Sequence, residues 1–250
     1  MPDPGEFKNH TSSLDNNEIA MLSLRGYACA VSMLIPAYHF FLASNLANEA
    51  GLKGKEYQQA ITIMFMKEAM FDRLIIQLRR LYDGDLKSLS SGNIVKLLQQ
   101  PDVYAWLENW SRTKMKWSSE EEAVIFDANI KFVIRQCELQ LKTQGELSTN
   151  DPMLATQAVL VRRAANKRAA HMTLDDFGIT DSDLYDLVFE ACLIARAIQQ
   201  CLGGDACDTN YEEVDQGSYD ASASMFGVKH PRGLLLGDLD ANLKIRRNRA

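Results

Sequence analysis

The sequence is poor in the residues on which metal sites and disulfide frameworks depend. Its 250 residues include only four histidines, without an HxxxH spacing, and five cysteines, without a CxxC pair. An odd number of irregularly spaced cysteines argues against a disulfide framework, and isolated histidines argue against a zinc site. Cys29, Cys137 and Cys192 lie in apolar helical runs, so we expect buried free thiols. These absences indicate a protein of the reducing cytoplasm that needs neither a metal nor another cofactor.

Long apolar segments are also missing from the sequence. The longest apolar stretch, residues 28–43, is interrupted by Ser32, Pro36 and His39. We expect this stretch to be too short and too polar to cross a bilayer. The N-terminal residues are polar and lack the apolar centre of a signal peptide. We therefore expect no contact with a membrane.

What is present is the pattern of a helical globular protein. With few prolines, apolar residues recur at three- and four-residue steps, which predicts long helices over residues 14–50, 55–82, 118–143, 151–171 and 180–202. Pro36 should kink the first of these helices rather than end it. Residues 93–100 and 101–110 are typical of two shorter helices within an insert at about residues 84–117.

These elements predict an all-α bundle of four to five long helices in one domain. We place that domain at residues 14–204, after a flexible leader of residues 1–13. Residues 205–243 are rich in Asp, Gly and Ser and lack helical periodicity, and the chain then ends in a basic run. We therefore interpret residues 205–250 as an irregular, basic-ended tail.

One segment combines the residue types that chemistry on a phosphate requires. Residues 162–171 read RRAANKRAAH in a chain whose net charge is −6. On a helical wheel, Lys167 lies about 40° from His171, Arg168 about 60° to the other side, and Arg163 about 80° away. One helix face therefore gathers an imidazole and three cations.

That face suits the cleavage of RNA without a metal. Histidine can move a proton near neutral pH, and lysine and arginine can hold a phosphate and stabilise its developing charge. RNA supplies its own nucleophile in the 2′-hydroxyl, so positioning and proton transfer suffice. The other interpretation is that the basic run is a solvated helix face and that the histidine is structural, and the spacing alone leaves both open.

The same residues resemble the signature of the HEPN superfamily, in particular its abortive-infection-like, AbiU2-type branch. In that signature an Arg and a polar residue precede a His by a few positions, and Asn166, Lys167, Ala170 and His171 match it. Residues 79–83 and 173–176 also resemble this branch. The similarity covers roughly residues 18–215 and is specific near His171.

The sequence departs from the family pattern at one important position. The motif Arg should stand directly before Asn166, where this chain has Ala165. Three explanations remain open: Arg163 or Arg168 takes over its role, the lineage has lost activity, or the residue has been altered. Loss of this group would remove a main source of transition-state stabilisation.

The resemblance implies a helical bundle that cleaves RNA as a toxin or antiphage defence effector. His171 would be the acid–base residue, Asn166 would orient it or the phosphate, and Lys167 with Arg163 or Arg168 would hold the phosphate. The implied partners are RNA, such as tRNA or mRNA, a second copy of the chain, and an antitoxin or another defence protein. The alternative is a degenerate, non-catalytic HEPN module that binds RNA or a partner protein.

Two further features have simpler interpretations. Trp106, Trp110 and Trp117 alternate with basic residues and could stack nucleic-acid bases, but we favour their packing of the insert against the bundle. His39 lies in an apolar helix and is expected to be a hydrogen-bonded core residue.

Overall fold

A computed structural model of the chain describes residues 15–50, 57–83, 90–147, 153–171, 179–203, 207–228 and 235–248. Within these ranges the regular structure consists of helices alone, which confirms the predicted all-α class. The predicted leader, residues 1–13, lies outside the described residues, and so do the side chains of residues 167–171.

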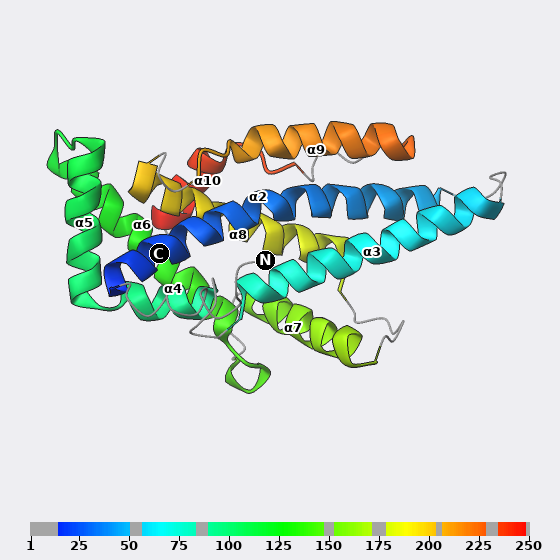
Figure 1. Cartoon of the computed structure of the whole chain (residues 1–250), viewed down its shortest axis with the longest axis horizontal. Coiled ribbons are helices and arrows are strands. Elements are labelled where there is room, and N and C mark those ends of the chain that lie inside the picture. The colour runs from blue at the N-terminus through cyan, green and yellow to red at the C-terminus, as the bar shows by residue number, and fades with distance from the viewer. Residues whose placement is uncertain are drawn as a thin grey trace, which may run out of the picture.

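The five predicted long helices are all present and form the bundle. They are α2 (Asn16–Glu49), α3 (Tyr57–Leu81), α6 (Glu120–Leu141), α7 (Met153–His171) and α8 (Asp181–Leu202). Helix α8 is the central element, because it packs against α2, α6 and α7 and is buried along most of its length. Figure 1 shows α3 running between α2 on one side and α7 on the other, and both contacts are close.

Three of the long helices begin with a capping box, in which an N-cap side chain and an acidic side chain three residues later satisfy backbone N–H groups reciprocally. The pairs are Asp15 with Glu18, Ser119 with Glu122, and Thr180 with Asp183.

The predicted insert contains α4 (Ser91–Leu98) and α5 (Pro101–Met115), and a single 3₁₀ turn, η1 (Gln144–Glu146), follows α6. Helix α4 is buried and packs against α2 and α6. Trp106, Trp110 and Trp117 all pack against the hydrophobic core. The guanidinium of Arg112 lies 5.0 Å from the centre of the Trp117 ring. The predicted packing role of the tryptophans is therefore confirmed.

Helix α2 continues through Pro36 without interruption. Among the described helices, α2 is long and apolar enough to cross a membrane by length and composition, contrary to our expectation, but half of its apolar window is buried inside the protein. It contacts α3, α8 and α9, and these contacts account for its apolar character.

The prediction of an irregular tail is wrong, because residues 205–250 contain α9 (Tyr211–Phe226) and α10 (Leu239–Asn248). Helix α9 lies along α2, on the side of the bundle away from α7 (Figure 1). The hydroxyl of Tyr211 donates to the carbonyl oxygen of Ala28 over 2.9 Å. Asp215 is buried, with one oxygen 2.6 Å from Nε2 of His39 and the other accepting the Leu236 N–H over 2.8 Å. Polar contacts that hydropathy patterns do not reveal therefore fix α9, and His39 has the core role expected of it.

Helix α10 is attached to α8 and α6. Its apolar residues Leu239 and Leu243 are fully buried. Arg196 of α8 forms two hydrogen bonds to the carboxylate of Asp240, over 2.8 and 2.7 Å. Arg247, from the basic run at the end of the chain, donates to Asn129 over 2.8 Å.

All five cysteines are free thiols, as expected. Cys137, Cys192 and Cys201 are buried, whereas Cys207 is half-buried. Cys29 is exposed, which contradicts its predicted burial. Its neighbours Ala28 and Val31 occupy the inward face of α2, and Cys29 lies on the outward face.

Candidate functional site

Helix α7 separates its small apolar residues from its polar ones. It packs against α3, α6 and α8. The residues that face this core include Ala158, Val161, Ala164 and Ala165, all of them buried. Arg163 and Asn166 are exposed. Small side chains on the inward face let α7 approach its neighbours closely, so the polar face is presented to solvent at a fixed orientation.

The first basic residue of the run, Arg162, has a structural role. Its Nη1 donates to the carbonyl oxygens of Gln140 over 2.5 Å and of Tyr82 over 3.4 Å, and its Nη2 donates to the carbonyl oxygen of Lys142. These carbonyls stand at the C-terminal ends of α3 and α6, where helices leave acceptors unsatisfied. Arg162 thus fastens the middle of α7 to the ends of two neighbouring helices.

Burial lowers the pKa of the Arg162 guanidinium, and the carboxylates of Asp83 and Glu146 oppose that shift. The group remains charged at neutral pH, since arginine loses its proton only under strongly basic conditions. Because its donors are directed to backbone carbonyls, we do not count Arg162 among the groups available to a phosphate. Sequence reasoning gave no role to this residue.

Ala165, which stands where the resemblance places the motif Arg, faces the core. Ala165 is 3% exposed and belongs to the main hydrophobic cluster. Its methyl group can neither donate a hydrogen bond nor hold a charge. The structure therefore does not bring position 165 together with the exposed residues of α7.

Arg163 and Asn166 do lie together. They are three residues apart on α7, a spacing that makes side chains neighbours on a helix surface, and both are exposed. Lys167, Arg168 and His171 continue the same helix, but their side chains lie outside those described. The predicted convergence of these three side chains on one face therefore stays a prediction.

Helix geometry sets how far apart the predicted site residues lie along α7. With a rise of about 1.5 Å per residue, Arg163 and His171 are about 12 Å apart along the axis, whereas Arg168 and His171 are about 4.5 Å apart. Along the helix axis, Arg168 and Lys167 are therefore nearer to His171 than Arg163 is.

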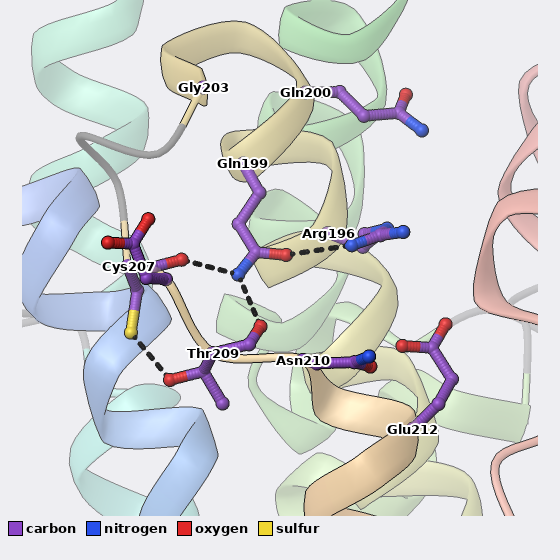
Figure 2. A pocket seen from close by; sticks show the side chains of 9 residues that line it. Arg196, Gln199, Gln200, Gly203, Cys207, Thr209, Asn210 and Glu212 are labelled. Atoms are coloured by element: carbon purple, nitrogen blue, oxygen red, sulfur yellow. Dashed lines mark hydrogen bonds between the residues drawn. The ribbon is translucent and has the colours of Figure 1, made fainter.

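A pocket of about 510 Å³ lies elsewhere, between the end of α8 and the start of α9. Figure 2 shows Gln199 at its centre, donating to the carbonyl oxygens of Cys207 over 2.8 Å and Thr209 over 2.9 Å. The side chain of Arg196 is engaged by Asp240. No residue of α7 lines this pocket, so it is distinct from the predicted RNA site. Sequence reasoning missed the pocket because part of its wall comes from the segment expected to be irregular.

In the part of the chain that the structure describes, no three His, Cys, Asp or Glu side chains are grouped closely enough to hold a metal ion. In the comparison with protein families, residues 6–221 match the family HEPN_AbiU2, described as AbiU2. This match covers α2 to α8, including the basic end of α7, and continues into α9. No curated protein and no solved structure matches the chain.

Proposed function

Because the chain belongs to the AbiU2 family of HEPN proteins, we propose that it is a metal-independent endoribonuclease that acts in the cytoplasm as a toxin or antiphage defence effector. The observation on which this rests is the arrangement of α7. A cation, Arg163, and an amide, Asn166, are exposed side by side on a helix that is fixed to the bundle by Arg162 and ends at His171.

In the proposed reaction, His171 takes the proton of the ribose 2′-hydroxyl, and the 2′-oxygen attacks the neighbouring phosphorus. The bond from phosphorus to the 5′-oxygen breaks, which leaves a 2′,3′-cyclic phosphate on one product. Lys167 and Arg168 hold the scissile phosphate and stabilise its charge, and Asn166 orients the phosphate or the imidazole. Arg163 contacts the adjacent phosphate and positions the strand.

A homodimer would complete this site. Helix α3, which packs directly against α7, exposes Met64 and Phe65 to 52% and 72%, respectively. Large apolar side chains exposed next to each other are typical of an interface. In a two-fold pairing through these side chains, a second copy of α7 would join the site, and its His171 would protonate the leaving 5′-oxygen. An antitoxin or another defence protein would restrain such an enzyme.

A second candidate function is a non-catalytic module that binds RNA or a partner protein. The burial of Ala165 favours it, because no phosphate ligand is present at the motif position. Removing one donor of this kind lowers the rate of an enzyme about 100- to 1,000-fold. The two candidates therefore differ in whether the remaining cations sustain turnover.

The test is cleavage of tRNA and total RNA in the presence of EDTA. We expect the chain to cut RNA, His171→Ala to abolish cutting, and Arg163→Ala to slow it roughly ten- to hundredfold. Lys131→Ala is the matched control, since it removes an exposed cation of α6 that is paired with Asp127. RNA that is retarded on a gel but never cleaved, with binding that weakens as salt rises, would instead establish the binding module.

A further inference from the structure

The C-terminal helix α10 is held on the bundle by an apolar face and by a polar contact at its start. Leu239 and Leu243 are fully buried, and α10 packs against α8 and α6. The carboxylate of Asp240 accepts two hydrogen bonds from Arg196 of α8, over 2.8 and 2.7 Å, and a third from Gln200 over 2.8 Å. In Figure 2 the Arg196 side chain extends from α8 towards the red ribbon of α10. Packing and charge therefore both fix the start of this helix.

A second polar contact lies near the end of α10. Arg247 donates to the side-chain oxygen of Asn129 on α6 over 2.8 Å and to that of Gln200 on α8 over 3.3 Å. Asn129 is fully buried, and its own amide group donates to Gln200 over 3.1 Å. We call the surface of Asn129, Arg196 and Gln200 on which α10 lies the α6–α8 face. Because Asn129 and Gln200 are joined directly, this part of the face does not depend on α10 for its shape.

The chain just before α10 combines a fixed segment with a hinge. The carbonyl oxygen of Leu235 accepts a hydrogen bond from the Tyr185 hydroxyl over 3.1 Å, and the Leu236 N–H donates to buried Asp215 over 2.8 Å. Gly237 follows with a φ of +64°, a conformation that glycine adopts without steric cost. A change of backbone angles at Gly237 therefore moves α10 and leaves the two preceding residues in place.

Helix α10 is too short to persist away from the α6–α8 face. It has ten residues, and isolated helices of fewer than about 12–15 residues are marginal in water. Release of α10 therefore melts one short helix and leaves the long helices packed. Such local openings need less free energy than global unfolding, so α10 can be displaced while the bundle stays folded.

The two sides of this contact stand differently in the comparison with the AbiU2 family. The match covers residues 6–221, which include α6 and α8. Helix α10 begins at Leu239, outside the matched residues. The α6–α8 face thus belongs to the part of the chain that fits the family, whereas the helix that covers it lies beyond that part.

We propose that the α6–α8 face is a docking site for an amphipathic helix of a partner protein, and that α10 covers this face in the partner's absence. The chemistry of the face describes the partner. Its helix carries two apolar side chains four residues apart, in place of Leu239 and Leu243, and a carboxylate that binds Arg196. On a helical wheel, Leu239, Asp240, Leu243 and Arg247 lie within about 100°, which is the single face that a helix presents to a groove. No residue of α7 takes part, so the inference goes beyond RNA cleavage and does not depend on it.

The covering helix sets how tightly a partner binds. Because α10 is joined to the α6–α8 face through the chain, its effective concentration is far above that of a separate protein. The partner's apparent affinity falls in proportion to the fraction of molecules in which the face is uncovered. A partner helix therefore displaces α10 only when it makes more contacts than ten residues allow, which excludes weak binders.

The experiment uses the full chain and a fluorescent synthetic peptide of residues 235–248 as the probe. Leu243→Glu in the chain places a charge where α10 is buried and uncovers the α6–α8 face. We expect this variant to bind the peptide roughly ten- to hundredfold more tightly than the parent does, as measured by fluorescence anisotropy. The matched control Ile245→Glu makes the same change at a position of α10 that is 51% exposed, and it should bind the peptide as weakly as the parent.

Substitutions in the peptide test whether the contacts of α10 are used. We expect Leu243→Glu in the peptide to weaken binding to the uncovered chain about tenfold or more, and Ile245→Glu in the peptide to leave it unchanged. Asp240→Asn in the peptide should weaken binding to the uncovered chain. The same peptide should bind like the unchanged one when the chain also carries Arg196→Ala, because the two side chains then no longer interact.

The proposal is overturned if the folded Leu243→Glu chain does not bind the peptide, or if the two glutamate substitutions in the peptide have the same effect. A parent dimer that Leu243→Glu converts into monomers also overturns it, because the occupant of the face would then be the α10 of a second copy. Circular dichroism shows whether Leu243→Glu folds. Amide hydrogen exchange of the unchanged chain is independent of that variant: α10 should exchange before α8, and exchange of both helices together would overturn the proposal.

Discussion

One prediction concerns how a buried carboxyl group affects the stability of the core. The group belongs to Glu190, in the middle of α8. Its side chain is 3% exposed, and its Oε1 atom has no hydrogen-bond partner. Burial raises the pKa of Glu190 from 4.5 to about 7; Arg246 lowers it and Asp186 raises it further. Charged Glu190 is therefore poorly accommodated in the folded protein, and we expect Glu190→Gln to be more stable than the parent at neutral pH.

The magnitude follows from the difference between the folded and unfolded pKa values, 7 − 4.5 = 2.5. At about 1.4 kcal/mol for each unit, the ionised carboxyl costs the folded state about 3 kcal/mol. The sign follows from the raised folded pKa: the penalty is absent below about pH 4.5, grows between pH 4.5 and 7, and is complete above pH 7. The neutral amide of the Glu190→Gln variant has no such dependence, so its advantage should follow the same window.

The assay is urea unfolding of the parent and Glu190→Gln between about pH 4.5 and 8.5. We expect a stability difference near zero at the acid end and about 1–3 kcal/mol in favour of the variant at about pH 8, after allowance for imperfect hydrogen bonding of the amide. Glu138→Gln is the control, because Glu138 is exposed on α6 and accepts a hydrogen bond from Gln99 that an amide oxygen can replace. A difference that does not vary with pH, or a variant less stable than the parent at the alkaline end, would refute the reasoning.

Three further predictions concern α7 and α9. Ala165→Arg should lower the free energy of unfolding by about 2–4 kcal/mol, because it forces a long charged side chain into a packed interface; urea unfolding measures this, and Arg163→Ala should change stability by less than about 0.5 kcal/mol. Arg162→Met should cost about 2–4 kcal/mol in the same assay, since three carbonyl groups lose a donor. Asp215→Ala should speed amide hydrogen exchange in α9 and at Leu236 while α7 keeps its protection, because Asp215 joins α9 to His39 and to the Leu236 N–H.

Much of the fold could be predicted because it rests on apolar periodicity. The five long helices each bury a face of Leu, Ile, Val or Ala, and three of them begin at capping boxes visible in the sequence. Helix α9 could not be predicted in this way. Its attachment depends on Tyr211 and Asp215, whose partners are a carbonyl group and a histidine on α2. Such partners are distant in the sequence, and no local sequence pattern predicts them.

The candidate site shows the same division between local and distant information. The helical wheel groups Arg163 with His171 and gives no role to Arg162, whose donors are used by carbonyl groups at the ends of α3 and α6. The resemblance to the family fixes which position the motif Arg should occupy, but only the packing of α7 shows that Ala165 faces the core there. The roles of Lys167, Arg168 and His171 stay predictions from the sequence.

The anchoring of Arg162 also bears on how this stretch of sequence can change over evolution. Arg162 fixes the rotation of α7 about its axis. Whether a later residue of α7 faces solvent or the core therefore depends on how many residues separate it from Arg162. Deleting one residue between Arg162 and Asn166 would turn all that follows by about 100°, placing Asn166 where Ala165 now meets the core. Residue types on the exposed face can be exchanged one by one, but the number of residues between Arg162 and the end of the helix is constrained.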